Sequence, residues 1–279
     1  MTVLFVLAVA AARDRARQAA LVAPGRPAGR AGVAGPLHEL AVLLLDEGRP
    51  GDALESARTA IAAWRAVLAD DPDYYSGELA GTLAVHARAL WAVGRRGEAL
   101  AAGLEAADRF RDLLPASRAD LIRALLLVSG FRRDEDALPH ALEAVELARE
   151  AAPELLARAL ARLAAVHTGL GRADDAAAAT REGLAVWLRA EPASGLLEPE
   201  DAGVLTGLAA ALASNGRPGV AVEVMSAVAT AYRRRIRTFR LIDGPAGPAA
   251  TSDARQLRHH LRTRLRDTLR ARAAYHSKR

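Results

Sequence analysis

The sequence of 279 residues contains no cysteine, few aromatic residues and almost no lysine. Without cysteine the chain can form no disulfide bond, no thiolate metal site and no cysteine nucleophile. Aromatic residues make up 4% of the chain although 51% of it is hydrophobic, so the apolar residues are mostly Ala, Leu and Val. Because Ala and Leu rank highest in helix propensity, this composition favours closely packed helices over strands.

The motifs of common enzyme and metal sites are also missing. The segment Gly25–Gly29 resembles a phosphate-binding loop only in composition, since it lacks the lysine and precedes no predicted strand. No Gly-x-Ser-x-Gly motif occurs. No His-x-x-x-His pair occurs among the seven histidines, which are His38, His86, His140, His167, His259, His260 and His276. We therefore expect no enzymatic activity, no cofactor and no metal site.

The N-terminal segment is apolar over Met1–Ala12 and is followed by Arg13, Asp14, Arg15 and Arg17. A secretory signal would carry its positive charge before the apolar run, and a membrane span would be about twice as long. Three interpretations stay open: an ordinary helix or a misassigned start, an atypical signal, and an anchor at a membrane surface. The first is favoured, which predicts a cytoplasmic protein without an integral membrane span.

Charge is strongly segregated along the chain. The basic residues are 37 Arg and the single Lys278, a bias typical of GC-rich bacterial coding sequence. The formal net charge of +5 combines +4 for residues 1–36, −10 for residues 37–231 and +11 for residues 232–279. An acidic body is therefore followed by a basic tail.

One short motif recurs five times, which indicates internal repeats. In most copies a glycine precedes an arginine, an acidic residue and an alanine; the copies are Gly48–Leu54, Gly94–Leu100, Arg132–Leu138, Gly171–Ala177 and Gly216–Val222. The motif alanines are Ala53, Ala99, Ala137, Ala176 and Ala221, at separations of 46, 38, 39 and 45 residues. Glycine can end one helix in the left-handed conformation, and the acidic residue suits the start of the next. The small alanine permits the two helices to approach closely.

Apolar residues at spacings of three and four precede several motif copies, and prolines follow them. The apolar faces include Leu37, Leu40, Ala41, Leu44, Leu160, Leu163, Ala164, Leu205, Leu208, Ala209 and Leu212. The prolines at 72, 115, 153 and 192 lie 19, 16, 16 and 16 residues after a motif alanine and are expected to close the second helices. The predicted helix pairs are 37–47 with 50–69, 77–93 with 96–113, 117–129 with 134–150, 154–170 with 173–190, and 199–214 with 218–240.

These residues resemble the tetratricopeptide repeat family in its extended-period bacterial form, over roughly residues 37–231. His86 departs from the pattern where the family usually has Leu, and Arg132 stands at the usual Gly position. The resemblance implies an all-α, right-handed α-solenoid of about five helix-turn-helix repeats, near 37–72, 77–115, 117–153, 154–192 and 199–240. We expect an N-terminal segment and linker over 1–36, the array over 37–240, and a linker with a basic helix over 241–279. Linkers are expected at the Gly- and Pro-rich stretches 24–36 and 244–248.

In that family the first helix of each repeat lines a concave groove that binds the partner. The resemblance assigns to this groove His38, Arg88, Trp91, Arg123, Arg158 and Arg162. A row of arginines there would bind carboxylates of an extended peptide. In the alternative interpretation Trp91 is buried between helices and the arginines are solvated. Trp64 and Trp187 fall on second helices and are expected in the core.

The basic tail combines arginines with an apolar stripe. Its candidate anion-binding residues are Arg233, Arg234, Arg235, Arg258, Arg262, Arg266 and Arg270, and its stripe is Leu257, Leu261, Leu265 and Leu269. Such a helix would cap the end of the array, with its arginines also lying against the acidic body. Nucleic acid, an anionic membrane or a partner helix are the alternative ligands.

The sequence as a whole predicts a non-enzymatic scaffold that binds a protein or peptide partner in bacterial regulation or signalling. The alternative is a nucleic-acid-associated regulator that uses the arginine-rich C-terminal helix.

Overall fold

The computed structural model is all-α. It describes residues 10–12, 14–15, 17–18, 27–70, 75–194, 205–206, 208–210, 212–213, 216–242 and 252–277; for 27–29, 187–194, 234–242 and 252–261 it describes the backbone alone. No strand occurs in these ranges, and none of their helices is both long and apolar enough to cross a membrane. The chain divides into two compact units, Met1–Arg132 and Arg133–Arg279, which are described in turn.

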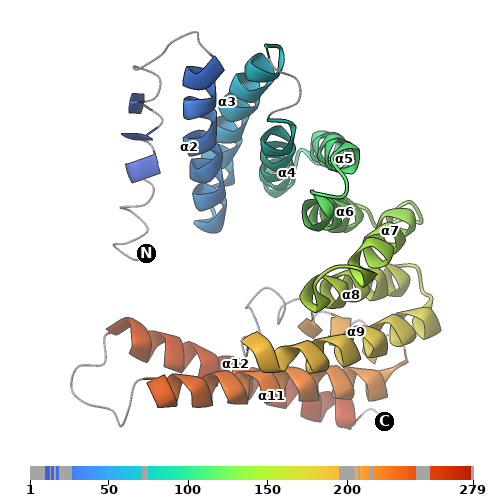
Figure 1. Ribbon diagram of the computed structural model, residues 1–279. Coiled ribbons are helices and arrows are strands. Elements are labelled where there is room, and N and C mark those ends of the chain that lie inside the picture. Colours follow the sequence, from blue (N-terminus) through green and yellow to red (C-terminus); the bar gives the residue numbers. More distant parts are fainter. Residues whose placement is uncertain are drawn as a thin grey trace. The chain divides into compact units, whose positions relative to one another are not determined.

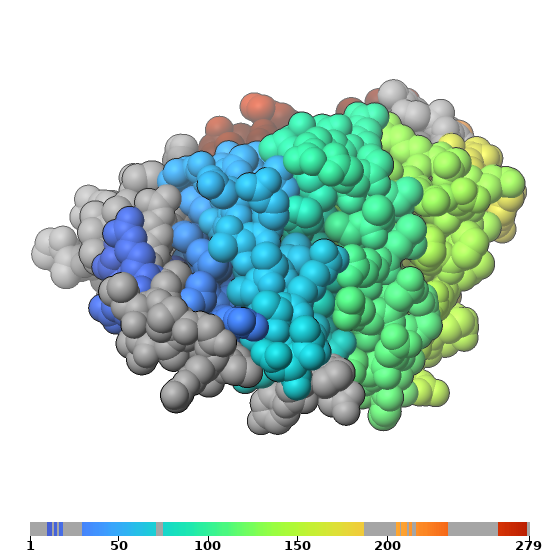
Figure 2. Space-filling model, turned by 90° about the horizontal axis from the view of Figure 1, so that it is seen from above, coloured from blue at the N-terminus to red at the C-terminus, as the bar shows by residue number. Residues whose placement is uncertain are grey.

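The first unit contains two helical hairpins and the first helix of a third. Besides the helical residues described between 10 and 18, its helices are α2 (Pro27–Asp46), α3 (Pro50–Leu68), α4 (Ser76–Ala92), α5 (Arg96–Asp112) and α6 (Arg118–Phe131) (Figure 1). Each packs on the next in chain order, and α2, α4 and α6 also contact their counterparts in neighbouring hairpins. On the face shown in Figure 2 the side chains of this unit form consecutive bands from blue to green, which follow the order of the chain.

The second unit begins with α7 (Ala137–Arg149), α8 (Pro153–Gly169) and α9 (Ala173–Ser194), and ends with α11 (Pro218–Ile242) and α12 (Ser252–His276). Consecutive helices pack from α7 to α9, α9 contacts α11, and α12 lies alongside α11 (Figure 1). The helix predicted over 199–214 lies only partly within the described residues, and those at 205–206, 208–210 and 212–213 are helical. Paired helices that repeat along the chain make this an all-α repeat fold.

The left-handed glycine turns are confirmed at four motif copies. Gly48, Gly94, Gly171 and Gly216 have φ angles of 73°, 85°, 73° and 76°. At the first copy the Gly48 amide donates to the Leu45 carbonyl at 3.0 Å and the Arg49 amide donates to the Leu44 carbonyl at 2.9 Å. This pair of bonds is the Schellman motif, which satisfies carbonyls that the end of a helix leaves free. A side chain at these glycines would strain the turn.

The third motif copy differs because it lacks this glycine. Gly130 lies inside α6, and Arg132 adopts an extended conformation with φ −102° and ψ 151°. The chain therefore leaves α6 without a left-handed residue, and α7 begins at Ala137, three residues after the predicted start at 134.

The motif alanines are buried, as predicted. Ala53, Ala99, Ala176 and Ala221 are fully inaccessible to solvent, and Ala137 is 1% exposed. Trp64 is also in the core, where it stacks on Tyr75 with ring centroids 5.1 Å apart. The side chain of Trp187 lies outside the described residues.

The segment 24–36, which the sequence predicted as a linker, is helical from Pro27 onward. Proline is favourable at the first helical position, but Pro36 inside α2 removes one backbone hydrogen bond, at a cost of about 3 kcal/mol. Tertiary contacts offset that cost: Ala34 is buried against Ile61 and Trp64, and the Arg30 guanidinium donates to the Ala66 carbonyl at 3.3 Å. Composition alone could not reveal these contacts.

The closing prolines are confirmed in part. Pro115 lies in the turn that follows α5, whereas Pro72 lies outside the described residues. Pro153 is the first residue of α8, and Pro192 lies within α9, which continues to Ser194. Proline's fixed φ is compatible with a helix, and near the helix end its missing N–H costs only one bond. The expected closure of a second helix at Pro192 is therefore wrong.

The described residues between 10 and 18 are helical and pack on α2. Ala12 is buried in a cluster with Leu40 and Leu44, and an Arg15 guanidinium nitrogen lies 2.7 Å from a Glu39 carboxylate oxygen. Of the three interpretations of the N-terminus, these contacts favour the ordinary helix for the described residues of this segment. Residues 1–9 lie outside the described part.

Candidate interaction surfaces

Close packing leaves the first helix α8 only a narrow strip open to solvent. In α8 the buried residues are Ala157, Ala159, Leu160, Ala161, Leu163, Ala164 and Val166, which occupy most of the helix circumference. Glu154 and Arg158 are exposed, and Arg162 is half-buried one turn further on. The arginines predicted on α8 therefore lie on its open strip. They belong to the second unit, whereas His38, Arg88, Trp91 and Arg123 belong to the first.

Arg162 differs from the other arginines predicted for the groove because it is half-buried and has no carboxylate partner among the described residues. Burial alone lowers the pKa of its guanidinium group. Partial desolvation of an unpaired cation is unfavourable, and an incoming anion would relieve that cost. Arg162 can therefore act as a preformed anion contact.

Arg88 and Arg123 lie exposed on the first helices of neighbouring hairpins in the first unit. An Arg88 nitrogen lies 4.0 Å from an Asp46 oxygen, and Arg123 pairs with Asp120 of the same helix at 2.6 Å. All four side chains are about half exposed. Exposed pairs of this kind contribute roughly 0–1 kcal/mol, so a ligand carboxylate can replace the internal partner at small cost.

His38 is half-buried between α2 and α4. Its Nδ1 lies 3.1 Å from the Thr82 hydroxyl oxygen, and that hydroxyl donates to the Glu78 carbonyl at 2.8 Å. Burial lowers the pKa of His38, and the nearby Glu39 partly opposes this shift. The residue therefore helps to join adjacent first helices, and its assigned role as a ligand contact gains no support from this geometry.

Trp91 is half-buried between helices, as the alternative interpretation held. Its ring stacks on Phe131 at the end of α6, with centroids 4.6 Å apart and an interplanar angle of 14°. The Arg96 guanidinium lies 5.5 Å from the Trp91 ring centroid on the other side of the hairpin turn. Stacking and cation–π contacts together fix the ring as a junction between α4, α5 and α6.

Three ion pairs between second helices were not predicted from the sequence. Arg65 pairs with Glu105 at 3.0 Å, Arg149 with Glu182 at 3.1 Å and Arg181 with Glu223 at 3.6 Å. The partners are 40, 33 and 42 residues apart, about one repeat length. We call these three pairs the second-helix ladder. Opposite charges at the repeat spacing were its signal in the sequence.

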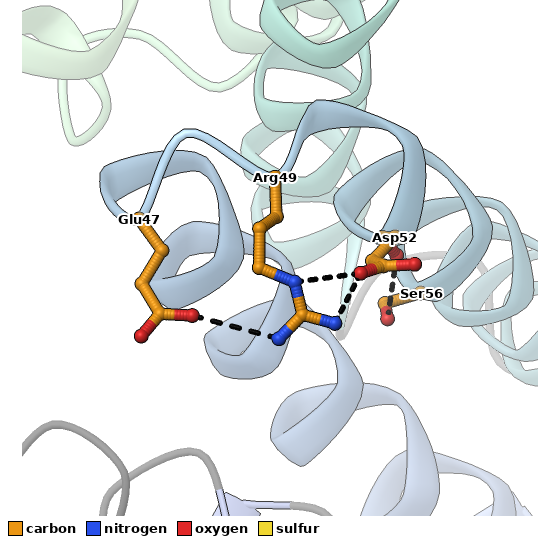
Figure 3. A network of polar contacts seen from close by, with 4 residues as sticks. All are labelled: Glu47, Arg49, Asp52 and Ser56. Carbon is orange, nitrogen blue, oxygen red and sulfur yellow. Dashed lines mark hydrogen bonds and ion pairs between the residues drawn. The ribbon is translucent and has the colours of Figure 1, made fainter. Parts of the chain in front are cut away.

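The arginine that follows each motif glycine is also paired. In the first hairpin turn Arg49 Nε donates to Asp52 at 2.7 Å, Arg49 approaches Glu47 at 3.6 Å, and the Ser56 hydroxyl donates to the Asp52 carbonyl (Figure 3). In the second unit Arg172 reaches Glu135 at 2.9 Å and Arg217 reaches Asp174, each one repeat earlier in the chain. The recurring Gly-Arg element therefore serves the turns and the stacking of repeats.

The basic helix α12 packs on α11 through its apolar side, as the predicted cap requires. Leu265, Ala271 and Tyr275 pack against a buried cluster that includes Val224, Met225 and Val228. The expectation that the arginines also lie against the acidic body is wrong for Arg262, Arg266 and Arg270, which are exposed. The apolar contacts orient the helix so that this side faces solvent. Arg233 of α11 is exposed as well, whereas the side chains of Arg234, Arg235 and Arg258 lie outside the described residues.

No group of three or more His, Asp or Glu side chains capable of holding a metal ion occurs in the described part of the chain. Its titratable groups with clearly shifted pKa values are partly buried histidines, ion-paired residues and Arg162.

Neither a family model nor a curated protein matches the sequence. Solved structures do match the fold. BtubC (BKLC) from P. vanneervenii has a TM-score of 0.64 at 17% identity, with 90% of this chain and 97% of that chain covered. The apo form of RapI has a TM-score of 0.63 at 13% identity, over 98% of this chain and 92% of that chain. A Rap protein complexed with competence and sporulation factor has a TM-score of 0.55 at 14% identity, over 99% and 88%. The chain thus has a helical-repeat fold.

Proposed function

We propose that this chain is a non-enzymatic interaction scaffold of the tetratricopeptide type, which binds an extended acidic segment of a partner protein along the open strips of its first helices. It would act in the cytoplasm of a bacterium, in regulation or signalling. One neighbour of similar fold was solved in complex with competence and sporulation factor, which supports ligand binding by a fold of this kind.

The observation that carries the proposal is Arg162, a partly buried cation on the open strip of α8 without a carboxylate partner among the described residues. The other arginines of the array mostly have nearby acids, so this one is free to contact a ligand. Arg158 is exposed one turn earlier on the same strip, and two guanidinium groups at this spacing suit an acidic peptide.

The test is selection of a displayed library of random peptides on the intact protein, followed by affinity measurement with one selected peptide. We expect the selected peptides to share Asp or Glu residues. Arg162→Gln should weaken binding about 10- to 100-fold, since a charge-assisted hydrogen bond contributes roughly 1.5–3 kcal/mol.

Arg181→Gln on the second-helix ladder is the matched control, because it removes the same charge from an exposed position on a second helix. It should leave the affinity unchanged. Equal losses in both variants, or peptides without acidic residues, would contradict the proposed surface.

A further inference from the structure

Among the described residues, two arginines on the outward side of α12 lack the carboxylate partner that most arginines of the array have. In the array, most arginines that project from the helices and turns reach a carboxylate: Arg49, Arg65, Arg95, Arg109, Arg111, Arg123, Arg149, Arg172, Arg181 and Arg217. On α12, Arg262 and Arg266 have no such partner among the described residues. Arg270 lies 3.8 Å from Asp267, and these two side chains are 75% and 60% exposed. The positive charge of this side is therefore largely uncompensated.

The three arginines form a row of fixed direction. Arg262, Arg266 and Arg270 recur every fourth residue, which places them on one side of the helix with a rise of about 6 Å between neighbours. The opposite side packs on α11, where Thr268 is buried and Leu265 and Tyr275 contact the apolar cluster. Because α12 is held by these contacts, the row is oriented before any ligand arrives. We call Arg262, Arg266 and Arg270 the α12 arginine row.

We propose that the α12 arginine row binds the phosphate backbone of double-stranded nucleic acid without reading its sequence. Guanidinium groups donate bidentate hydrogen bonds to phosphate oxygens, and a linear row of them matches a ligand with regularly spaced negative charge. Contacts with phosphates position a protein on a duplex but carry no base information. This activity is separate from peptide binding by the first helices and does not depend on it.

The same structure argues against the other anionic ligands. A membrane-surface helix inserts its apolar side into the bilayer, but the apolar side of α12 is occupied by α11. Single-stranded nucleic acid is held by stacking on aromatic side chains, and the one Phe, Tyr or Trp of α12 is Tyr275, which packs in the cluster. A protein partner would need large apolar anchors, whereas the other exposed residues of the described part of α12 are Arg264, Asp267, Ala273, Ala274 and His276.

The experiment measures binding of the intact protein to a labelled random-sequence DNA duplex of about 20 base pairs by fluorescence anisotropy, over a series of salt concentrations. The test variant is Arg262→Gln/Arg266→Gln/Arg270→Gln. If each arginine contacts one phosphate, the slope of log affinity against log salt should become shallower by about 2.7. The matched control is Arg65→Gln/Arg149→Gln/Arg181→Gln, which removes the same net charge from the second-helix ladder and should leave the slope unchanged.

A second variant keeps the test valid if the triple substitution disturbs folding. Asp267→Asn removes the carboxylate that pairs with Arg270, and it should raise duplex affinity severalfold. Absence of duplex binding at low salt, equal slopes in the test and control triples, or no gain with Asp267→Asn would overturn the proposal. Binding to phosphatidylserine vesicles or poly-glutamate as tight as to the duplex would also overturn it, since the row would then be a general anion contact.

Discussion

At the scale of single residues, two kinds of buried position affect the stability of the repeats. Small alanines lie where paired helices touch, and histidines occupy sites on first helices where their rings are partly desolvated. His86 stands where the tetratricopeptide pattern usually has Leu. Its Nδ1 is buried without a hydrogen-bond partner among the described residues.

His86 should make the stability of the protein depend on pH. Burial lowers the pKa of His86 from its ordinary value of 6.5, and the nearby Arg95 lowers it further. The folded protein then keeps the ring neutral while the unfolded chain takes up a proton, so stability falls as the pH drops below about 6.5. His86→Leu should reduce the difference in Tm between pH 8 and pH 5.5, measured by circular dichroism.

Burial also lowers the pKa values of His38 and His167. The difference in Tm between pH 8 and pH 5.5 should therefore become smaller in His86→Leu but should not vanish. The exposed His276 provides the control, and His276→Leu should leave the difference as in the unchanged protein. An undiminished pH dependence in His86→Leu would refute the role of this ring.

The motif alanines should tolerate no large side chain. Ala176 is fully buried where α9 packs on α8, so Ala176→Phe should lower the free energy of unfolding by about 1–3 kcal/mol in urea titrations. Arg181→Ala, five residues further along α9, removes an exposed ion pair and should cost no more than about 0.5 kcal/mol. Comparable losses at both positions would mean that the repeat register is wrong.

At the scale of helices, a left-handed glycine follows the first helix in four of the five motif copies. In the second hairpin the Gly94 amide donates to Trp91 and the Arg95 amide donates to Leu90, at 3.0 and 2.9 Å. The third motif copy shows the converse, because Arg132 in the glycine position is extended and α7 starts later. Backbone conformation, more than side-chain contact, therefore shapes these turns.

Substitution by alanine should change stability in opposite directions at Gly94 and Gly97, which lie close together in the second hairpin. Gly94 has a φ of +85°, so Gly94→Ala should cost about 1–2 kcal/mol of stability. Gly97 lies in α5 with nothing within 4 Å of an added Cβ, so Gly97→Ala should stabilise by roughly 0.4–1 kcal/mol. Urea unfolding of both variants checks this, and a Gly94→Ala protein as stable as Gly97→Ala would contradict the turn geometry.

At the scale of the whole molecule, the basic C-terminal helix completes the second unit. Leu265, Ala271 and Tyr275 of α12 cover the cluster formed by Val224, Met225 and Val228 of α11. An array of repeats ends in an apolar face, and such a face needs a cover. The tail therefore combines a packed apolar side with an exposed basic side.

Removal of residues 250–279 should destabilise the protein. Without α12 the apolar cluster on α11 is uncovered, which should lower the free energy of unfolding by about 2–4 kcal/mol and so lower the Tm. The uncovered cluster should also bind the dye ANS. The triple variant of the α12 arginine row keeps the apolar side of α12, so its Tm should be unchanged. This comparison separates the effect of the apolar contacts on stability from the effect of the arginine charges. A deletion with an unchanged Tm and no dye binding would show that α12 is not a cap.

The sequence by itself determined the repeat architecture, the glycine turns and the buried alanines, because these depend on local conformation and on spacing along the chain. Tertiary structure alone decided that 27–36 is helical despite Pro36, since Ala34 and Arg30 gain contacts with α3 that composition does not reveal. It also decided that Trp91 and His38 join helices and that Arg162 has no nearby acid among the described residues. The direction of the α12 arginines likewise depends on which side of that helix packs on α11. Each of these outcomes depends on neighbours far away in sequence, whose positions only the folded chain determines.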